Sequence, residues 1–191
     1  MATEPNAIKT MKKYYSDRLH VESNENLMAE LLGGNHRSAI ITVASLCDSI
    51  LEYRIFAALP GLEGCTEKEF DDAFRHDSGM GTFSARINLA FYMQLIDGTT
   101  RGQLNDIRQI RNAVAHTSRR VTFDDEPLRN AARRILHPTG MHRLLEDTSE
   151  GYLRSYIAEA LLVRSIVEYG RDEGIARLRE GYLASRGESP I

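Results

Sequence analysis

The stretch His36–Leu59, HRSAIITVASLCDSILEYRIFAAL, decides the fold of this 191-residue chain. Pro60-Gly61 ends its apolar pattern, so the stretch is expected to form one long helix. With successive residues about 100° apart, most of its apolar side chains fall on one broad arc. The arc comprises Ile40, Val43, Ala44, Cys47, Ile50, Leu51 and Ala58. A helix with so wide an apolar face is expected to lie at the centre of the core.

One charged residue, Arg54, falls on the same arc. A guanidinium keeps its proton, so either the aliphatic stem of Arg54 carries the charge outward or a buried acid pairs with it. We expect a structural salt bridge at Arg54. Further along the chain, Arg86 lies in another helical pattern, and a salt bridge within the core is expected there too.

The other segments with clear periodicity also read as helix, and short clusters of glycine or proline separate them. With 42% hydrophobic residues, the chain is long enough for one core, so residues 1–191 are expected to form a single all-α domain. Two helix starts match the capping-box pattern, Thr66 with Glu69 and Thr100 with Gln103. Besides 36–59, the expected helices cover residues 4–18, 25–32, 67–74, 82–97, 103–116, 124–136 and 149–186, with an extended loop at 120–123 and a turn at 137–140.

Charge and cysteine content exclude several classes of protein. The formal net charge is −3, with 24 basic and 27 acidic residues, so the chain is not expected to coat duplex DNA, and any nucleic-acid contact would be local. The two cysteines, Cys47 and Cys65, form neither a disulfide framework nor a metal-ligand spacing, which fits a reducing compartment. No secretory signal or membrane-spanning run is visible, so a soluble cytoplasmic protein without a membrane partner is expected.

The segment Gln103–His116, QLNDIRQIRNAVAH, separates into two stripes when it is projected as a helix. The apolar stripe is Leu104, Ile107, Ile110 and Val114; the polar stripe is Asn105, Arg108, Asn112 and His116. Arg111 falls inside the apolar stripe. Its guanidinium there requires a carboxylate, carbonyl groups or a bound anion.

Arg111 and His116 are five residues apart, which separates their directions by about 140° on an ideal helix. Either the last turn loosens near His116, or the same helix of a second chain completes the pair. Asn112 and His116 are four residues apart and can touch directly. The expected unit is therefore Asn112 with His116, with Arg111 approaching from a packed interface.

The string R-N-x-x-x-H near the end of a helix resembles the signature of the HEPN superfamily, small all-helical proteins that include metal-independent endoribonucleases acting as dimers. The segments Gly81–Ile87 (GTFSARI), Ile110–His116 (IRNAVAH) and Phe123-Asp124 look like the mannitol operon repressor family, which shares this helical core. The resemblance covers about residues 36–130. It implies a HEPN-like helical bundle with additional N- and C-terminal helices.

The resemblance implies RNA cleavage in which a 2′-OH attacks the adjacent phosphate, without a metal or other cofactor. Histidine can give or take a proton at neutral pH, which suits His116 to this chemistry. Arg111 would bind the phosphate and stabilise its developing charge, while Asn112 would hold the imidazole or the phosphate. Such a protein is expected to be a homodimer acting on RNA, in the manner of a toxin or defence ribonuclease, with an antitoxin or regulatory protein as a further partner.

Several alternatives stay open. The mannitol repressor resemblance implies a non-catalytic transcriptional regulator that acts through protein partners. In a structural interpretation, His116 caps the helix C-terminus, and Arg111 forms a buried ion pair with Asp48 or Glu52. For RNA binding, a local basic rim is expected at Arg108, Arg119 and Arg120, with Arg101 nearby. Three arginines of the next helix could extend this rim: Arg129, Arg133 and Arg134. In the alternative interpretation, all of them are ordinary arginines on a solvated surface.

Overall fold

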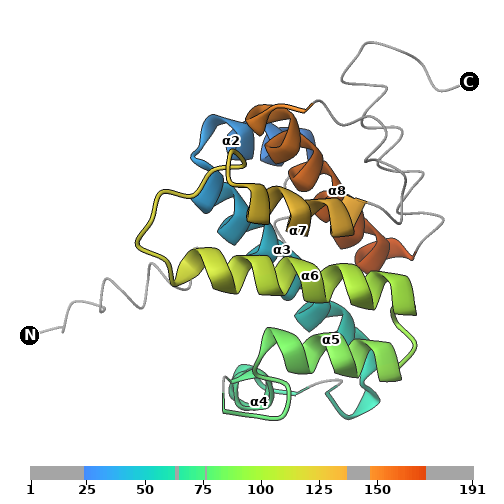
Figure 1. Cartoon of the computed structure of the whole chain (residues 1–191). Coiled ribbons are helices and arrows are strands. Elements are labelled where there is room, and N and C mark those ends of the chain that lie inside the picture. The colour runs from blue at the N-terminus through green and yellow to red at the C-terminus, as the bar shows by residue number, and fades with distance from the viewer. Residues whose placement is uncertain (1–23, 63–64, 76, 137–146, 171–191) are drawn as a thin grey trace, which may run out of the picture.

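The computed structural model describes residues 24–62, 65–75, 77–136 and 147–170, and these are helical apart from short connections (Figure 1). The helices are α2 (Asn24–Gly33), α3 (His36–Ala58), α4 (Glu67–Phe74), α5 (Phe83–Tyr92), α6 (Gly98–Ala115), α7 (Glu126–Leu136) and α8 (Ser149–Tyr169), with a 3-10 turn, η1, at Pro60–Leu62. No strand occurs in the described ranges, so the all-α prediction is confirmed. The more specific HEPN-like arrangement stays a prediction. None of the described helices has the length and apolar content needed to cross a bilayer.

Helix α3 holds the fold together because it packs against α5, α6 and α8. In Figure 1, α5, α6 and α7 lie in front, and α3 passes behind α6. The chain order places α7 between α6 and α8, and it contacts both. The helix that carries the R-N-x-x-x-H string, α6, therefore lies across the central helix.

The predicted arc of α3 is confirmed apart from its last residue. Its buried residues are Ala39, Ile40, Val43, Ala44, Cys47, Ile50, Leu51 and Ile55. Ala58 is exposed, although Phe56 and Leu59 on either side of it pack against the core. Burial raises the pKa of the Cys47 thiol to about 12, and this thiol donates to the Ala160 carbonyl at 3.5 Å.

Two half-buried acids of α3 pair with Arg86 rather than with Arg54. The Arg86 guanidinium lies 2.7 Å from Asp48 Oδ1 and 2.9 Å from Glu52 Oε2, and it also donates to the Phe74 carbonyl. The expected salt bridge at Arg86 is confirmed. The one expected at Arg54 is wrong over the described residues, since Arg54 forms no ion pair there and its buried Nε has no hydrogen-bond partner.

Two helices begin at the capping residues that the sequence predicted for them. Thr66 caps α4 in a complete capping box, and its backbone N–H, helped by its hydroxyl, lowers the pKa of the Glu69 carboxyl. Thr82 caps α5 by accepting from the Ala85 N–H at 3.1 Å. The expected helix at 4–18, the turn at 137–140 and the end of the last helix at 171–186 lie outside the described residues.

At the connection between α5 and α6, two helix boundaries differ from the predicted ones. Helix α5 ends at Tyr92 instead of reaching Asp97, because the chain turns at Gln94 with a left-handed φ of 59°. Asp97, not Thr100, caps α6: its Oδ1 accepts from the Thr100 N–H at 2.7 Å. Gln103 is inside the helix and buried, where it donates to Glu159 at 2.7 Å, so it is not part of a capping box.

The ion pairs of Arg86 with two acids predict how its replacement changes the stability of the fold. Arg86→Met leaves the half-buried carboxylates of Asp48 and Glu52 facing each other without a cation, and it is expected to lower the free energy of unfolding by about 3 kcal/mol. Urea denaturation measures the change. Arg75→Met is the matched control, because Arg75 pairs with acids on an exposed surface and should have little effect. Equal losses for the two variants would contradict the central role of Arg86.

Candidate functional site

The last two turns of α6 carry the candidate site, and the apolar stripe of this helix sets their orientation. Leu104, Ile107, Ile110 and Val114 are all buried, as predicted. Because these four side chains anchor one side of α6 in the core, the polar stripe on the other side is directed away from it. Asn105, Arg108 and Asn112 are half-buried, while His116 is exposed.

Arg111 is half-buried and lies beside Asn112. Its Nη1 donates to Asn112 Oδ1 at 3.0 Å. No carboxylate pairs with Arg111 among the described residues, and Asp48 and Glu52 are bound to Arg86. The alternative that made Arg111 their ion-pair partner is therefore wrong, and its positive charge is not neutralised by an acid of the described chain.

His116 is the C-cap residue of α6, with φ −99° and ψ 2°, so the helix ends just before it. Its imidazole forms no hydrogen bond with the described residues: the expected contact with Asn112 is not made, and no helix carbonyl is capped by the ring. The side chain is exposed at the helix end. An imidazole in this position is accessible to a ligand or to a second chain.

Three arginines along α6 share a mode of pairing that the sequence did not reveal. Each donates to an asparagine oxygen rather than to an acid, and none has an ion pair among the described residues. The pairs are Arg101 with Asn88 (2.8 Å), Arg108 with Asn105 (3.5 Å) and Arg111 with Asn112 (3.0 Å). We call these three arginines the arginine row. A neutral amide orients a guanidinium without cancelling its charge, so the row stays fully cationic.

The arginines of α7 have acidic or aromatic partners, and Arg133 also donates to Asn130 Oδ1 at 2.9 Å. Arg134 forms an ion pair with Asp106 at 3.1 Å, and Arg129 and Arg133 lie over the Tyr152 ring at 5.8 and 5.2 Å from its centroid. Arg133 also lies 4.0 Å from Asp147, so the expected extension of the basic rim onto α7 is partly neutralised at both Arg133 and Arg134.

The segment after His116 is held by the start of α3, a contact that sequence reasoning missed. Arg37 donates to the Thr117 carbonyl at 2.7 Å and also to the Arg119 carbonyl. The neighbouring His36 accepts from the Phe123 N–H at 3.0 Å through its Nδ1. Since the partners are about eighty residues apart in sequence, no local pattern could have paired them.

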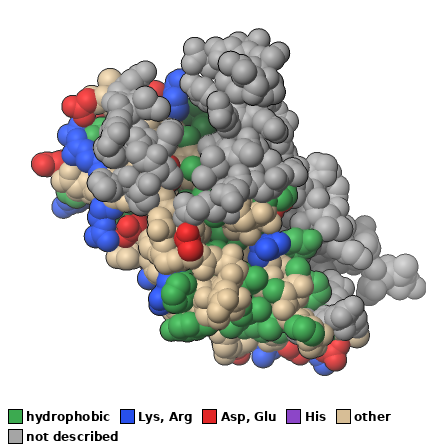
Figure 2. Space-filling view, turned by 90° about the vertical axis from the view of Figure 1, so that its right-hand side faces the viewer, with side chains coloured by type: hydrophobic (Ala, Val, Ile, Leu, Met, Phe, Trp, Pro, Cys, Tyr) green, Lys and Arg blue, Asp and Glu red, His purple; other side chains and the backbone are tan. Residues whose placement is uncertain are grey.

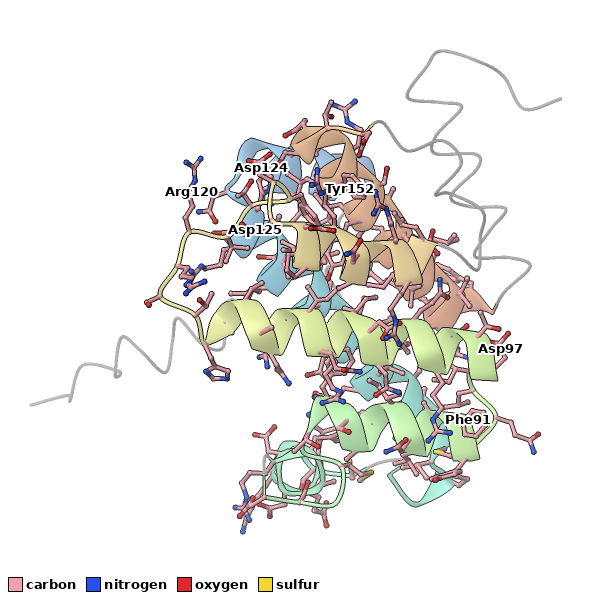
Figure 3. All side chains as sticks on the ribbon, in the orientation of Figure 1. Phe91, Asp97, Arg120, Asp124, Asp125 and Tyr152 are labelled. Carbon is pink, nitrogen blue, oxygen red and sulfur yellow. The ribbon has the colours of Figure 1, made fainter. Side chains whose placement is uncertain are left out.

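Arg119 and Arg120, the other predicted RNA-binding residues, are exposed in this segment. Figure 3 shows Arg120 close to Asp124 and Asp125, beyond the C-terminal end of α6. The pKa of the Asp124 carboxyl is lowered, mainly by the Thr122 hydroxyl and to a smaller extent by the Ser149 hydroxyl, His36 and Arg120. Arg120 thus has an acid nearby, whereas the members of the arginine row form no ion pair with the described residues.

Within the described ranges, no three His, Cys, Asp or Glu side chains are grouped so that they could hold a metal ion. Comparison of the chain with protein-family models, curated proteins and solved structures finds no match in any of the three.

The Arg37 contacts lead to a prediction about the order of the segment after His116. Arg37→Ala removes charge-assisted hydrogen bonds to two carbonyls, and it is expected to lower the free energy of unfolding by about 2 kcal/mol and to speed amide hydrogen exchange at residues 117–119. Arg119→Ala is the control, because only the backbone carbonyl of Arg119 accepts from Arg37. A loss as large in the control would show that the hydrogen bonds are not the cause.

Proposed function

We propose that this chain is a metal-independent endoribonuclease of the HEPN type, in which Arg111, Asn112 and His116 form the active site and a second copy of the chain completes it. One observation carries the proposal: among the described residues, Arg111 has only an asparagine oxygen as its partner, and His116, exposed at the end of the same helix, has no hydrogen-bond partner there. A structural role would require an acid for Arg111 and a carbonyl for His116. Neither partner is present among the described residues.

The chemistry needs a proton donor and acceptor and a fixed positive charge. The 2′-oxygen of a ribose attacks the adjacent phosphorus while its proton passes to a base. The bond from phosphorus to the 5′-oxygen breaks, and that oxygen takes up a proton, leaving a 2′,3′-cyclic phosphate and a 5′-hydroxyl. His116 carries out a proton transfer, Arg111 stabilises the charge on the phosphate oxygens, and Asn112 orients Arg111.

The arginine row supports a polyanionic substrate. The whole chain carries a net charge of −3, so three arginines on one helix that form no ion pair with the described residues are a local exception to the acidic charge balance of the chain. A row of this kind can bind the phosphates of a nucleic acid strand. The rest of the chain is acidic overall, which disfavours binding to duplex DNA over a wide surface. The attacking 2′-OH restricts the cleaved substrate to RNA.

The helical geometry supports a second copy in the proposed site. On an ideal helix, residues five apart such as Arg111 and His116 point about 140° apart, and in the structure His116 is the C-cap that follows the last helical residue, Ala115. A symmetric homodimer with two α6 ends facing one another would place Arg111 of one copy opposite His116 of the other. Both cysteines are free thiols, which fits a protein that works in the reducing cytoplasm.

The nuclease proposal predicts cleavage that needs no metal. Purified protein incubated with RNA in EDTA is expected to release products ending in a 2′,3′-cyclic phosphate, and His116→Ala should lower the rate at least 100-fold, as loss of a general acid or base does. Ser118→Ala, which changes an exposed neighbour, is the matched control and should cleave normally.

Two outcomes would sink the nuclease proposal. One is equal survival of RNA with the native protein and with His116→Ala. The other is cleavage of an oligonucleotide whose 2′-hydroxyls are all replaced by hydrogen. The first would leave a non-catalytic, mannitol repressor-like regulator as the remaining hypothesis.

The shared active site predicts complementation between inactive variants. Arg111→Ala and His116→Ala should each be inactive alone, yet a mixed dimer has one site in which Arg111 and His116 are both intact. Mixing the two after brief unfolding and refolding is expected to restore about a quarter of the native rate, since roughly half of the dimers are mixed and each has one of two sites. No recovery, or a monomeric mass by light scattering, would contradict the shared site.

A further inference from the structure

A hollow of about 620 Å³ lies at the other end of α6, where α5 turns into α6. Its walls include Phe91, Tyr92, Leu95 and Ile166, and its polar groups include Gln94 and Asp97. Figure 3 shows Phe91 and Asp97 at this end of α6, opposite the end near Arg120. The corresponding face is turned to the viewer in Figure 2, where hydrophobic side chains gather on its lower part.

Tyr92 is the side chain of this hollow that most needs an explanation. It is 71% exposed, more than any other large hydrophobic residue among the described ranges. The turn at Gln94, with its left-handed φ of 59°, places an exposed glutamine beside it. Non-glycine residues adopt this backbone conformation at a cost, and such positions gather at functional sites. The hollow thus combines an accessible aromatic face with an amide that can both donate and accept hydrogen bonds.

Arg101 connects the hollow to the arginine row. Its guanidinium lies 4.5 Å from the centroid of the Phe91 ring and 5.8 Å from that of Tyr92, and Asn88 orients it. Arg101 and Arg111 are ten residues apart on one straight helix, which corresponds to about 15 Å along its axis. A strand with a phosphate at Arg111 therefore needs only a few nucleotides to bring another phosphate to Arg101.

We infer that the hollow beside Tyr92 is a nucleobase subsite for a single-stranded RNA, several nucleotides away from the bond that is cleaved. Tyr92 stacks on the base, the Gln94 amide contacts the base edge, and Arg101 binds the adjoining phosphate. This inference rests on the proposed function and extends it. The strand is single because a base inside a duplex is stacked on its neighbours and cannot lie against a side chain.

Charge favours a nucleic acid over a protein as the occupant. A protein partner that filled the hollow would leave the cationic row beside it without phosphates or acids, unless it also carried acids at matching intervals. A nucleic acid strand supplies base and phosphate in a regular repeat, which matches an aromatic ring next to a row of arginines.

The test uses the full chain with His116→Ala, so that RNA is bound without being cut, and a short fluorescein-labelled single-stranded RNA of mixed sequence in EDTA. Fluorescence anisotropy measures the dissociation constant. Adding Tyr92→Ala should weaken binding by about 5- to 150-fold, the worth of one stacked base, whereas Tyr92→Phe should bind within about twofold of the parent. Tyr53→Ala removes another exposed tyrosine, from α3, and should have no effect.

An abasic scan locates the stacked base. One abasic position in the RNA should weaken binding to the His116→Ala protein but make no further difference once Tyr92 is alanine, since the same contact is lost in both.

Equal binding by the alanine and phenylalanine variants at Tyr92 would overturn the subsite, and so would equal affinity for the single strand and its duplex. A change in mass by light scattering in Tyr92→Ala, with RNA binding unchanged, would mean that this face contacts another copy instead.

The two proposals, the base subsite and the nuclease activity, are contradicted by different results. Cleavage that depends on His116, together with binding that ignores Tyr92, would overturn the subsite and leave the nuclease intact. Binding that depends on Tyr92 without any cleavage by the native protein would overturn the nuclease and leave a single-strand RNA-binding site.

Discussion

The ion pairs of Arg86 are the constraint on which the other helices depend. Asp48 and Glu52 lie one turn apart on α3, so both carboxylates face the same side, and half-buried like charges at that distance repel each other. One guanidinium from α5 reaches both of them and also the last carbonyl of α4, and this joins three helices at one point. Arginine suits this position because its planar group presents several donors in a fixed fork. With α5 fixed in this way, the short turn that follows it limits where α6 can lie.

Arg86 of α5 and the arginines of α6 have different kinds of partner. Arg86 pairs with the two acids of α3, and among the described residues the partner of Arg111 is the amide oxygen of Asn112. The same arrangement recurs at Arg101 and Arg108, whose partners are asparagines as well. A carboxylate would have stabilised each guanidinium more strongly, but it would also have competed with any phosphate for the same donors. The amide gives orientation without that competition, which is the property an anion-binding side chain needs.

The sequence predicted the helices well and their charge partners poorly. The apolar stripe of α6 and the arc of α3 were visible because helical periodicity is local and because buried positions tolerate few polar groups. The capping box at Thr66 was also visible, since all its atoms come from four consecutive residues. Thr100 matched the same pattern but proved to be inside α6, because Asp97, three residues earlier, is an equally good cap and the pattern cannot rank the two.

The sequence by itself determined an all-helical chain, the position of its central helix and the side of α6 that enters the core, because each depends on residues within a few turns of one another. Only the tertiary structure decided that Arg86 rather than Arg54 or Arg111 holds the acids of α3, that Arg37 holds the segment after His116, and that Tyr92 borders a hollow at the far end of the same helix. The physical reason is that a charged side chain pairs with whatever the fold brings within about 4 Å. Those partners lie tens of residues away along the chain, where no spacing rule reaches.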